Sequence, residues 1–188
     1  MKTTILIFLV IINISCNHKT VSEKVDQNHI VSDKEVYSFL NVILEKQSKS
    51  ITTCRNEHVL EFIKDNEELK SMFNAEDLVF VNKQIENEKK FALNSDYLSS
   101  SNVIPEKIIN KLFIDSKNID TFWLEFEKKY ETQSYFSVSL PIFSSNKKTV
   151  IISTEILNRG GFGARGKTVY RKINGEWKLY KNYNSSIS

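Results

Sequence analysis

The sequence predicts an α+β fold in which N-terminal helices pack on a C-terminal antiparallel meander of three to four strands. Apolar residues recur at helical spacing from residue 32 to about residue 130, and the pattern changes to the two-residue alternation of strands after Gln133. The chain then ends with Asn174-Gly175 between two alternating segments, which is a strong signal for a β-hairpin. Helices followed by an antiparallel meander are typical of the α+β class.

The first 31 residues divide into a predicted export signal and a tether. Lys2 precedes an unbroken apolar run over residues 5–12, a combination found in secretory signals. The run is shorter than the roughly 20 apolar residues that span a bilayer. Residues 16–31 are mostly polar and predict a tether with a reach of roughly 20 Å. The expected organisation is a signal peptide over residues 1–15, an anchored cysteine and tether over 16–31, and a single α+β domain over 32–188.

The cysteine that ends the signal region carries a resemblance. Residues 14–16, Ile-Ser-Cys, resemble the lipobox of bacterial lipoproteins, in which this cysteine is acylated, although Asn13 stands where that pattern has an aliphatic residue. The resemblance implies a lipid on Cys16, and Asn17 after it implies sorting to the outer membrane, with the domain facing the periplasm. The alternative is an ordinary cleaved signal, which leaves a Cys16–Cys54 disulfide open.

Charge and length limit the classes of partner and fold. The 188 residues carry 26 basic and 23 acidic side chains, a net charge of +3. This balance predicts no large electrostatic field, so neither a nucleic-acid partner nor attraction to anionic lipid is expected. The length after the tether suffices for one domain whose stability comes from a packed core rather than from disulfides.

Capping signals divide the helical half into segments. Ser32 with Glu35 forms a predicted capping box, Asn74 is a second predicted N-cap, and Pro105 suits the first turn of a helix. The apolar spacing predicts helices that begin near residues 32, 55, 74, 105 and 118, the second running to Phe73 and the third extending as far as Phe91 or Ala92. The last of them carries an aromatic stripe, including Trp123, that is expected in the core.

Three segments of the C-terminal half are predicted strands. Residues 135–143 alternate, with Pro141 restricting them to a sheet edge or a break. Residues 149–157 are rich in β-branched side chains and predict a central strand. The two-residue turn at Asn174-Gly175 pairs Lys172 with Trp177 and Tyr170 with Leu179. That register places Tyr170, Trp177 and Leu179 on the core side of the hairpin.

A glycine-rich segment raises the question of a nucleotide site. Residues 161–166, Gly-Phe-Gly-Ala-Arg-Gly, have the spacing of a dinucleotide-binding loop. Such a loop needs a following helix whose N-terminal amides hold the pyrophosphate, but a β-rich segment follows here. We therefore interpret the segment as a connection between antiparallel strands and expect no cofactor. Arg159, Phe162 and Arg165 project from this predicted loop and are candidate contacts for an anionic ligand or a partner.

The remaining chemistry-bearing residues give no catalytic assignment. Cys54 and His58 are four apart and would share a helix face, but the other histidines lie in the tether, so no metal site is expected. The chain lacks the motifs of Walker loops, serine hydrolases, zinc proteases and EF-hands. No catalytic residue is assigned.

The Cys16 region and the C-terminal strands together resemble small bacterial lipoproteins of unassigned activity. Residues 174–179, Asn-Gly-Glu-Trp-Lys-Leu, are also similar to the closing hairpin of cystatin-like and NTF2-like α+β domains. The lipoprotein resemblance implies a membrane attachment and an envelope protein as partner. The favoured function is non-enzymatic binding of a partner or ligand. The alternative, which the NTF2-like resemblance implies, is a hydrolase or isomerase with a pocket between the sheet and the helix around Trp123.

Overall fold

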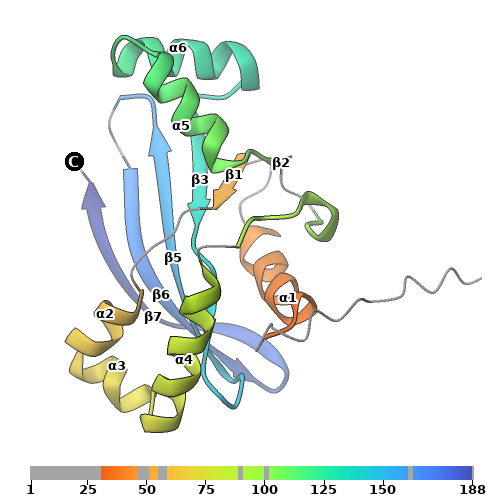
Figure 1. The fold of residues 1–188 in the computed structure, drawn as a ribbon, viewed down its shortest axis with the longest axis vertical. Coiled ribbons are helices and arrows are strands. Elements are labelled where there is room, and N and C mark those ends of the chain that lie inside the picture. The colour runs from red at the N-terminus through yellow and green to blue at the C-terminus, as the bar shows by residue number, and fades with distance from the viewer. Residues whose placement is uncertain are drawn as a thin grey trace, which may run out of the picture.

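The α+β class predicted from the sequence is confirmed by the structure, a computed structural model (Figure 1). It describes residues 31–45, 51–54, 59–88, 91–99, 102–160 and 163–187, so the predictions for Cys16 and the tether lie outside the described residues. The elements, in chain order, are α1 (Asp33–Leu44), β1 (Ile51–Cys54), α2 (Val59–Asp65), α3 (Glu67–Met72), α4 (Ala75–Glu88), the short 3-10 helix η2 (Ser95–Tyr97), β2 (Asn102–Val103), α5 (Glu106–Asp115), α6 (Ile119–Tyr130), β3 (Ser134–Val138), β4 (Ile142–Phe143), β5 (Thr149–Asn158), β6 (Gly163–Ile173) and β7 (Glu176–Ile187).

One sheet joins all the described strands, in the order β2-β1-β3-β5-β6-β7, with β4 pairing to β5. The strands from β3 onward pair antiparallel, and β5 lies at the centre as its β-branched composition predicts. Two short strands that the sequence did not predict, β1 and β2, extend the sheet with parallel pairing. The final three strands are the longest and form the frame on which the helices sit.

Helix α1 begins with the predicted capping box. The Glu35 backbone N–H donates to the Ser32 hydroxyl oxygen at 3.4 Å, and the Ser32 backbone N–H donates to the Glu35 carboxylate at 3.2 Å. Phe39 then meets three aromatic rings edge-on, those of Phe143, Tyr170 and Trp177, at centroid distances of 6.1, 5.3 and 5.3 Å. These contacts fix α1 to one face of the sheet and to the last hairpin.

The predicted helix over residues 55–73 is wrong as a single element. Asn66 interrupts it, because its side-chain oxygen accepts the Leu69 backbone N–H at 3.1 Å and so caps a new helix, α3. The buried side chains of Ile63, Leu69 and Phe73 still lie in the core, as the apolar spacing predicted.

Helix α4 is capped by Asn74, whose side-chain oxygen accepts the Asp77 backbone N–H at 2.9 Å. The extension to Phe91 or Ala92 is wrong, since α4 ends at Glu88 and residues 91–94 are not helical. Asp77 also accepts two hydrogen bonds of 2.6 Å from the backbone N–H and the hydroxyl of Ser145. This buried carboxylate therefore holds α4 against the turn that joins β4 to β5.

Regular strand structure is interrupted between β3 and β4, over residues 139–141, as Pro141 predicts. Ser139 keeps the ladder to β5 intact across this break. Its backbone N–H donates to the Ser153 carbonyl at 3.0 Å, and its hydroxyl oxygen accepts the Ser153 backbone N–H at 3.0 Å. The serines that alternate with the apolar residues here, Ser137 and Ser139, are both buried.

The register predicted for the last hairpin is confirmed, with Lys172 opposite Trp177 and Tyr170 opposite Leu179. Tyr170 and Trp177 pack on the core as expected, whereas Leu179 is exposed, which corrects its assignment to the covered side. A bulge follows, because Val169 pairs with Lys181 and leaves Tyr180 without an opposite residue.

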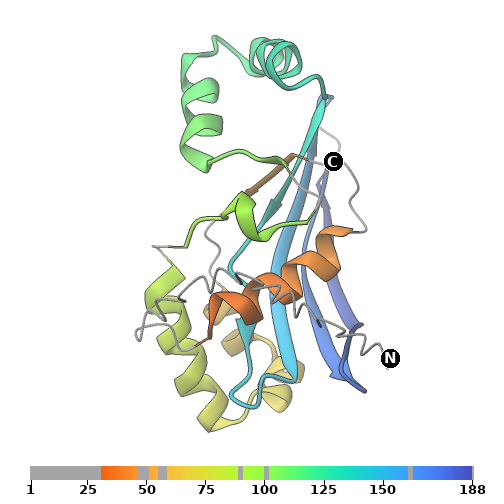
Figure 2. The same cartoon turned by 90° about the vertical axis from the view of Figure 1, so that its right-hand side faces the viewer.

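The helices form two groups, which lie at different positions along the long axis of the molecule. The larger core joins α1, α2, α3 and α4 to the strands, and a second, smaller core lies under α5 and α6. Figure 2 shows α5 and α6 at one end of an elongated molecule. In Figure 1, α2, α3 and α4 and the bend that leads into the β6–β7 turn occupy the other end, and the described chain begins at α1 beside that turn.

Candidate binding surfaces

The glycine-rich segment is part of a β-hairpin between β5 and β6. Gly160 adopts a left-handed backbone with φ 107°, and Gly163 is already the first residue of β6, with Gly166 inside that strand. A strand therefore follows the glycines where a dinucleotide loop would need a helix, as predicted. An added Cβ on Gly163 would lie 2.4 Å from the Ile156 carbonyl oxygen. Glycine at position 163 therefore allows strands β5 and β6 to lie close together.

Two of the three residues predicted as contacts, Arg159 and Arg165, lie beside acidic side chains of other elements. Arg159 pairs with Glu127 of α6, with 2.8 Å between its Nη1 and the carboxylate oxygen, and its backbone N–H donates to the Gln133 carbonyl. Arg165 lies within β6, opposite the buried Glu155 of β5, so its placement on the loop is corrected. Phe162 lies outside the described residues.

Cys54 lies in strand β1 rather than on a helix, which removes the geometric reason for pairing it with His58. His58 itself is not among the described residues. Within the described residues, no group of three or more His, Cys, Asp or Glu side chains is placed to hold a metal ion.

The aromatic stripe of α6 forms the second core, as predicted. Trp123 is 4% exposed, and its ring lies 5.6 Å from that of Phe126 and 6.0 Å from that of Tyr135, between centroids. Phe126 in turn lies 5.4 Å from Tyr135 of β3. Side chains thus fill the contact between α6 and the sheet around Trp123.

Three large apolar side chains remain exposed where α5 turns into α6. Phe113, Ile114 and Ile119 are 56%, 78% and 53% exposed, and the Phe113 ring contacts the buried Phe122 at 5.7 Å. We call these three residues the distal apolar surface. Its surroundings are mixed in charge, since residues 102–133 carry six acidic and five basic side chains. In the sequence, Phe113 continues the helical spacing of Ile109 and Leu112, so only Ile114, which lies off that spacing, could have signalled the surface.

The opposite end of the molecule presents basic and apolar side chains together. We define the hairpin tip as residues 171–180, which carry three basic side chains, Arg171, Lys172 and Lys178, and one acidic side chain, Glu176. The tip also exposes Ile173, Leu179 and Tyr180, at 46%, 59% and 46%. A hollow of about 360 Å³ separates the tip from α1 and is lined by Ser38, Val42, Lys172, Gly175, Glu176 and Trp177.

Aromatic rings position two of the basic groups of the tip. The Arg171 guanidinium carbon lies 3.8 Å from the centroid of Tyr180, and Lys172 Nζ lies 5.4 Å from that of Trp177. Cation–π contacts of this kind hold a charged group in place without neutralising it. Glu176 lies 3.7 Å from Lys178, so one of the three basic groups has an acidic neighbour.

Charge is segregated along the chain although its total is nearly balanced. Residues 139–188 contain nine basic and two acidic side chains, a net charge of +7, while residues 1–138 contain 17 basic and 21 acidic, a net charge of −4, and the two sum to +3. Strands β6 and β7 hold six of these nine basic side chains and one acidic side chain, so this pair of strands is strongly basic. The expectation of a weak field rested on the total charge and does not hold for this part of the sheet. A running charge count along the sequence would have revealed it.

A polar cluster joins α3 to the sheet on the face opposite α1. Glu68 and Lys181 form an ion pair, and the hydrogen bond between them holds the pKa of Glu68 below and that of Lys181 above the usual values. Burial raises the pKa of Tyr183, whose ring contacts Phe62 at 5.4 Å. These groups fasten α2 and α3 to β7.

No model of a known protein family matches the chain, and neither a curated protein nor a solved structure matches it. None of the described helices has both the length and the apolar character needed to cross a membrane.

Proposed function

We propose that this chain is a lipid-anchored, non-enzymatic domain that faces the periplasm from the outer membrane and binds an envelope protein. The anchoring part rests on the sequence, in which a short apolar run ends at Cys16 and a polar tether separates that residue from the folded part. For the binding function, we propose that the distal apolar surface contacts a partner protein.

The exposure of the distal apolar surface supports this proposal most directly. Three neighbouring large apolar side chains, each more than half exposed, are unusual on a monomer unless a partner covers them. The segment that carries them, residues 102–133, has charges of both signs, which matches the polar rim of protein–protein contacts better than it matches an anionic ligand. The surface also lies at the far end from the start of the described chain, where a partner would not meet the membrane (Figure 1).

The packing of the second core favours binding over the enzymatic alternative. That alternative needs a pocket between the sheet and the helix around Trp123. Side chains of α6 and β3 occupy this contact, with the ring centroids of Trp123 and Phe126 at 6.0 and 5.4 Å from that of Tyr135. An open cup with converging polar groups would have favoured a hydrolase or isomerase.

Crosslinking of the tethered protein in its native envelope tests the proposal. Ile114→Asp should remove the crosslinked partner, because it places a charge in the centre of the distal apolar surface. Leu124→Asp is the matched control. Leu124 is 52% exposed on the same helix pair but lies five positions from Ile119, about 140° around the helix. Equal crosslinking yields for the two variants would contradict a contact at the distal apolar surface.

A further inference from the structure

The hairpin tip combines features that its role in the fold does not require. Trp177 and Tyr170 anchor the hairpin to α1 through Phe39, so the core is complete without the exposed apolar side chains of the tip. Ile173, Leu179 and Tyr180 nevertheless stay about half exposed, and they lie among Arg171, Lys172 and Lys178. Apolar side chains interspersed with basic ones are what interfacial membrane-binding elements present to a bilayer.

The tip is also rigid enough to act as a preformed surface. The ring of Trp177 lies 5.3 Å from Phe39 and 6.0 Å from Phe143, and the backbone N–H of Lys172 donates to the Lys148 carbonyl at 2.8 Å. Exposed Lys148 therefore adds a fourth basic side chain beside the tip. A surface whose geometry is fixed loses little conformational entropy when it binds.

The hairpin tip lies at the same end of the molecule as the start of the described chain, which would orient the domain relative to the membrane. The described chain begins at Val31, directly before α1, and α1 and the tip line the same hollow through Ser38, Val42 and Lys172. Lys147 of the neighbouring turn contacts Glu35 in the first turn of α1 at 2.9 Å. A tether of residues 17–30 has a reach of roughly 20 Å, so a lipid on Cys16 would keep this end of the molecule beside the bilayer. This step rests on the proposed lipid anchor.

We propose that the hairpin tip docks on anionic phospholipid headgroups. Arg171, Lys172 and Lys178 contact the phosphates, and Ile173, Leu179 and Tyr180 enter the headgroup region. Nine of the 11 charged side chains in residues 139–188 are basic, so the electrostatic match is to an anionic surface. Docking in this way directs α5 and α6, and with them the distal apolar surface, away from the membrane (Figure 2).

A chain that lacks the lipid isolates this contribution. Both described cores are built from residues within 31–183, so a chain starting at residue 17 keeps the folded part and lacks the apolar signal and Cys16. We expect it to co-sediment with phosphatidylcholine vesicles that contain about 30% phosphatidylglycerol, and not with pure phosphatidylcholine, at low salt. Added salt should weaken the binding because it screens the charges.

Two triple variants with the same charge change locate the binding site. Neutralising the tip with Arg171→Gln, Lys172→Gln and Lys178→Gln should weaken vesicle binding about a hundredfold, since each basic group near the surface contributes about 1 kcal/mol. The control neutralises Lys107→Gln, Lys111→Gln and Lys117→Gln on and just after α5, three exposed lysines at the other end. Leu179→Ser should also weaken binding, and circular dichroism checks that each variant is folded.

Several outcomes would overturn the inference. Equal binding by the two triple variants would show that overall charge, not the tip, drives association. Absence of binding to the phosphatidylglycerol vesicles would exclude lipid docking. Tighter binding to a single-stranded oligonucleotide than to the vesicles at the same salt would reassign the tip to nucleic acid. None of these results depends on Cys16, so failure of the lipid anchor in cells and failure of the tip are separable.

Discussion

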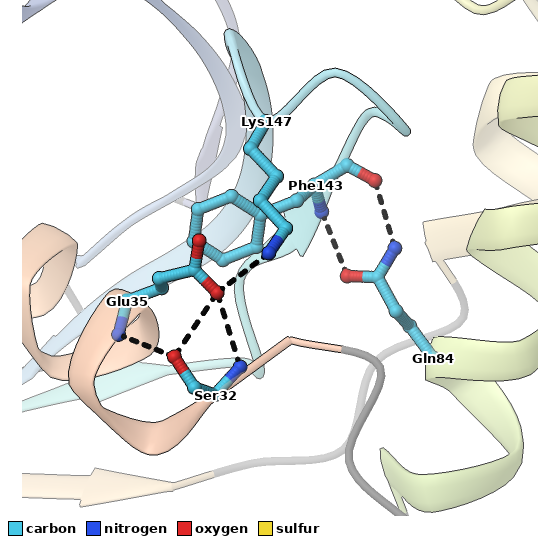
Figure 3. A network of polar contacts seen from close by, with 5 residues as sticks. All are labelled: Ser32, Glu35, Gln84, Phe143 and Lys147. Atoms are coloured by element: carbon cyan, nitrogen blue, oxygen red, sulfur yellow. Dashed lines mark hydrogen bonds and ion pairs between the residues drawn. The ribbon is translucent and has the colours of Figure 1, made fainter.

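Gln84 acts as a substitute for a neighbouring strand. Its side-chain amide N–H donates to the Phe143 carbonyl at 2.7 Å, and its side-chain oxygen accepts the Phe143 backbone N–H at 2.9 Å (Figure 3). Strand β4 is only two residues long, and these bonds pair both backbone groups of its last residue. Gln84 is itself buried, so water does not replace this interaction easily. A polar residue on the inner side of α4 thus supports the sheet.

Replacing the buried Gln84 should cost more stability than replacing an exposed polar residue of the same helix. Gln84→Leu keeps much of the side-chain volume but leaves the buried N–H and carbonyl of Phe143 without partners. We expect a loss of about 2–4 kcal/mol in the free energy of unfolding, measured by urea denaturation. Asn82→Leu, at an exposed position of the same helix, is the control and should change stability little. Similar losses in both variants would mean that helix propensity, not strand pairing, is responsible.

The ionisation of Glu35 is coupled to the fold. Burial by itself would raise the pKa of its carboxyl, but hydrogen bonds from Lys147 and Ser32 and the Lys147 charge outweigh burial and lower the pKa below 4.5 (Figure 3). A carboxyl with a depressed folded-state pKa stabilises the fold above its unfolded pKa and loses that contribution as the pH falls through the folded value.

A pH series of Glu35→Gln tests this coupling. The difference in unfolding free energy between the wild type and the variant should be constant near pH 7, shrink below about pH 4.5 and vanish once Glu35 is protonated in both states. Because the side chain is 36% exposed, solvent screening keeps the difference small. A difference that stays constant down to pH 3 would contradict the role assigned to the Glu35 charge.

At the scale of elements, local signals fixed some features and nonlocal contacts fixed others. The Asn174-Gly175 turn determined the hairpin register, since a two-residue loop allows one pairing. The Asn66 cap that splits α2 from α3 was present in the sequence, where acidic Glu67 and Glu68 follow it, but the continuous apolar spacing across it outweighed that signal. Strands β1 and β2 have four and two residues, too few for a period to be visible.

The β5–β6 hairpin gives a direct test of what the glycine-rich segment does. Gly163→Ala should destabilise the protein by at least about 1 kcal/mol, because its Cβ would lie 2.4 Å from the Ile156 carbonyl oxygen and force the strands apart. Ala164→Ser, at the next and exposed position, is the control. Thermal unfolding of both variants is the measurement. An unchanged melting temperature for Gly163→Ala would refute the close-approach explanation.

At the scale of the whole molecule, the two ends present different chemistry. The distal apolar surface has a balanced rim, and the basic final strands carry the hairpin tip. The total charge and the aromatic core could be predicted from the sequence, but only the fold shows which exposed residues gather at each end. The predicted contacts Arg159 and Arg165 are examples, since the partners that surround them come from α6 and β5.

The proposed lipid anchor, if present, gives this arrangement a fixed orientation in the cell. Cys16→Ala should abolish labelling of the protein by a fatty-acid analogue, because the thiol is the acceptor in the lipoprotein pattern that residues 14–16 resemble. Cys54→Ala, the other cysteine of the chain, should leave labelling unchanged. Labelling that persists in Cys16→Ala would place the lipid elsewhere and remove the basis for the proposed attachment.

The bulge at Tyr180 changes the phase of strand β7. In a regular strand Trp177 and Tyr183 would point to the same side, since six residues separate them. With one residue inserted, Trp177 contacts Phe39 of α1 while Tyr183 contacts Phe62 of α2, on opposite faces. A single strand therefore serves two helix layers, and deletion of that one residue would exchange the faces of every side chain beyond it.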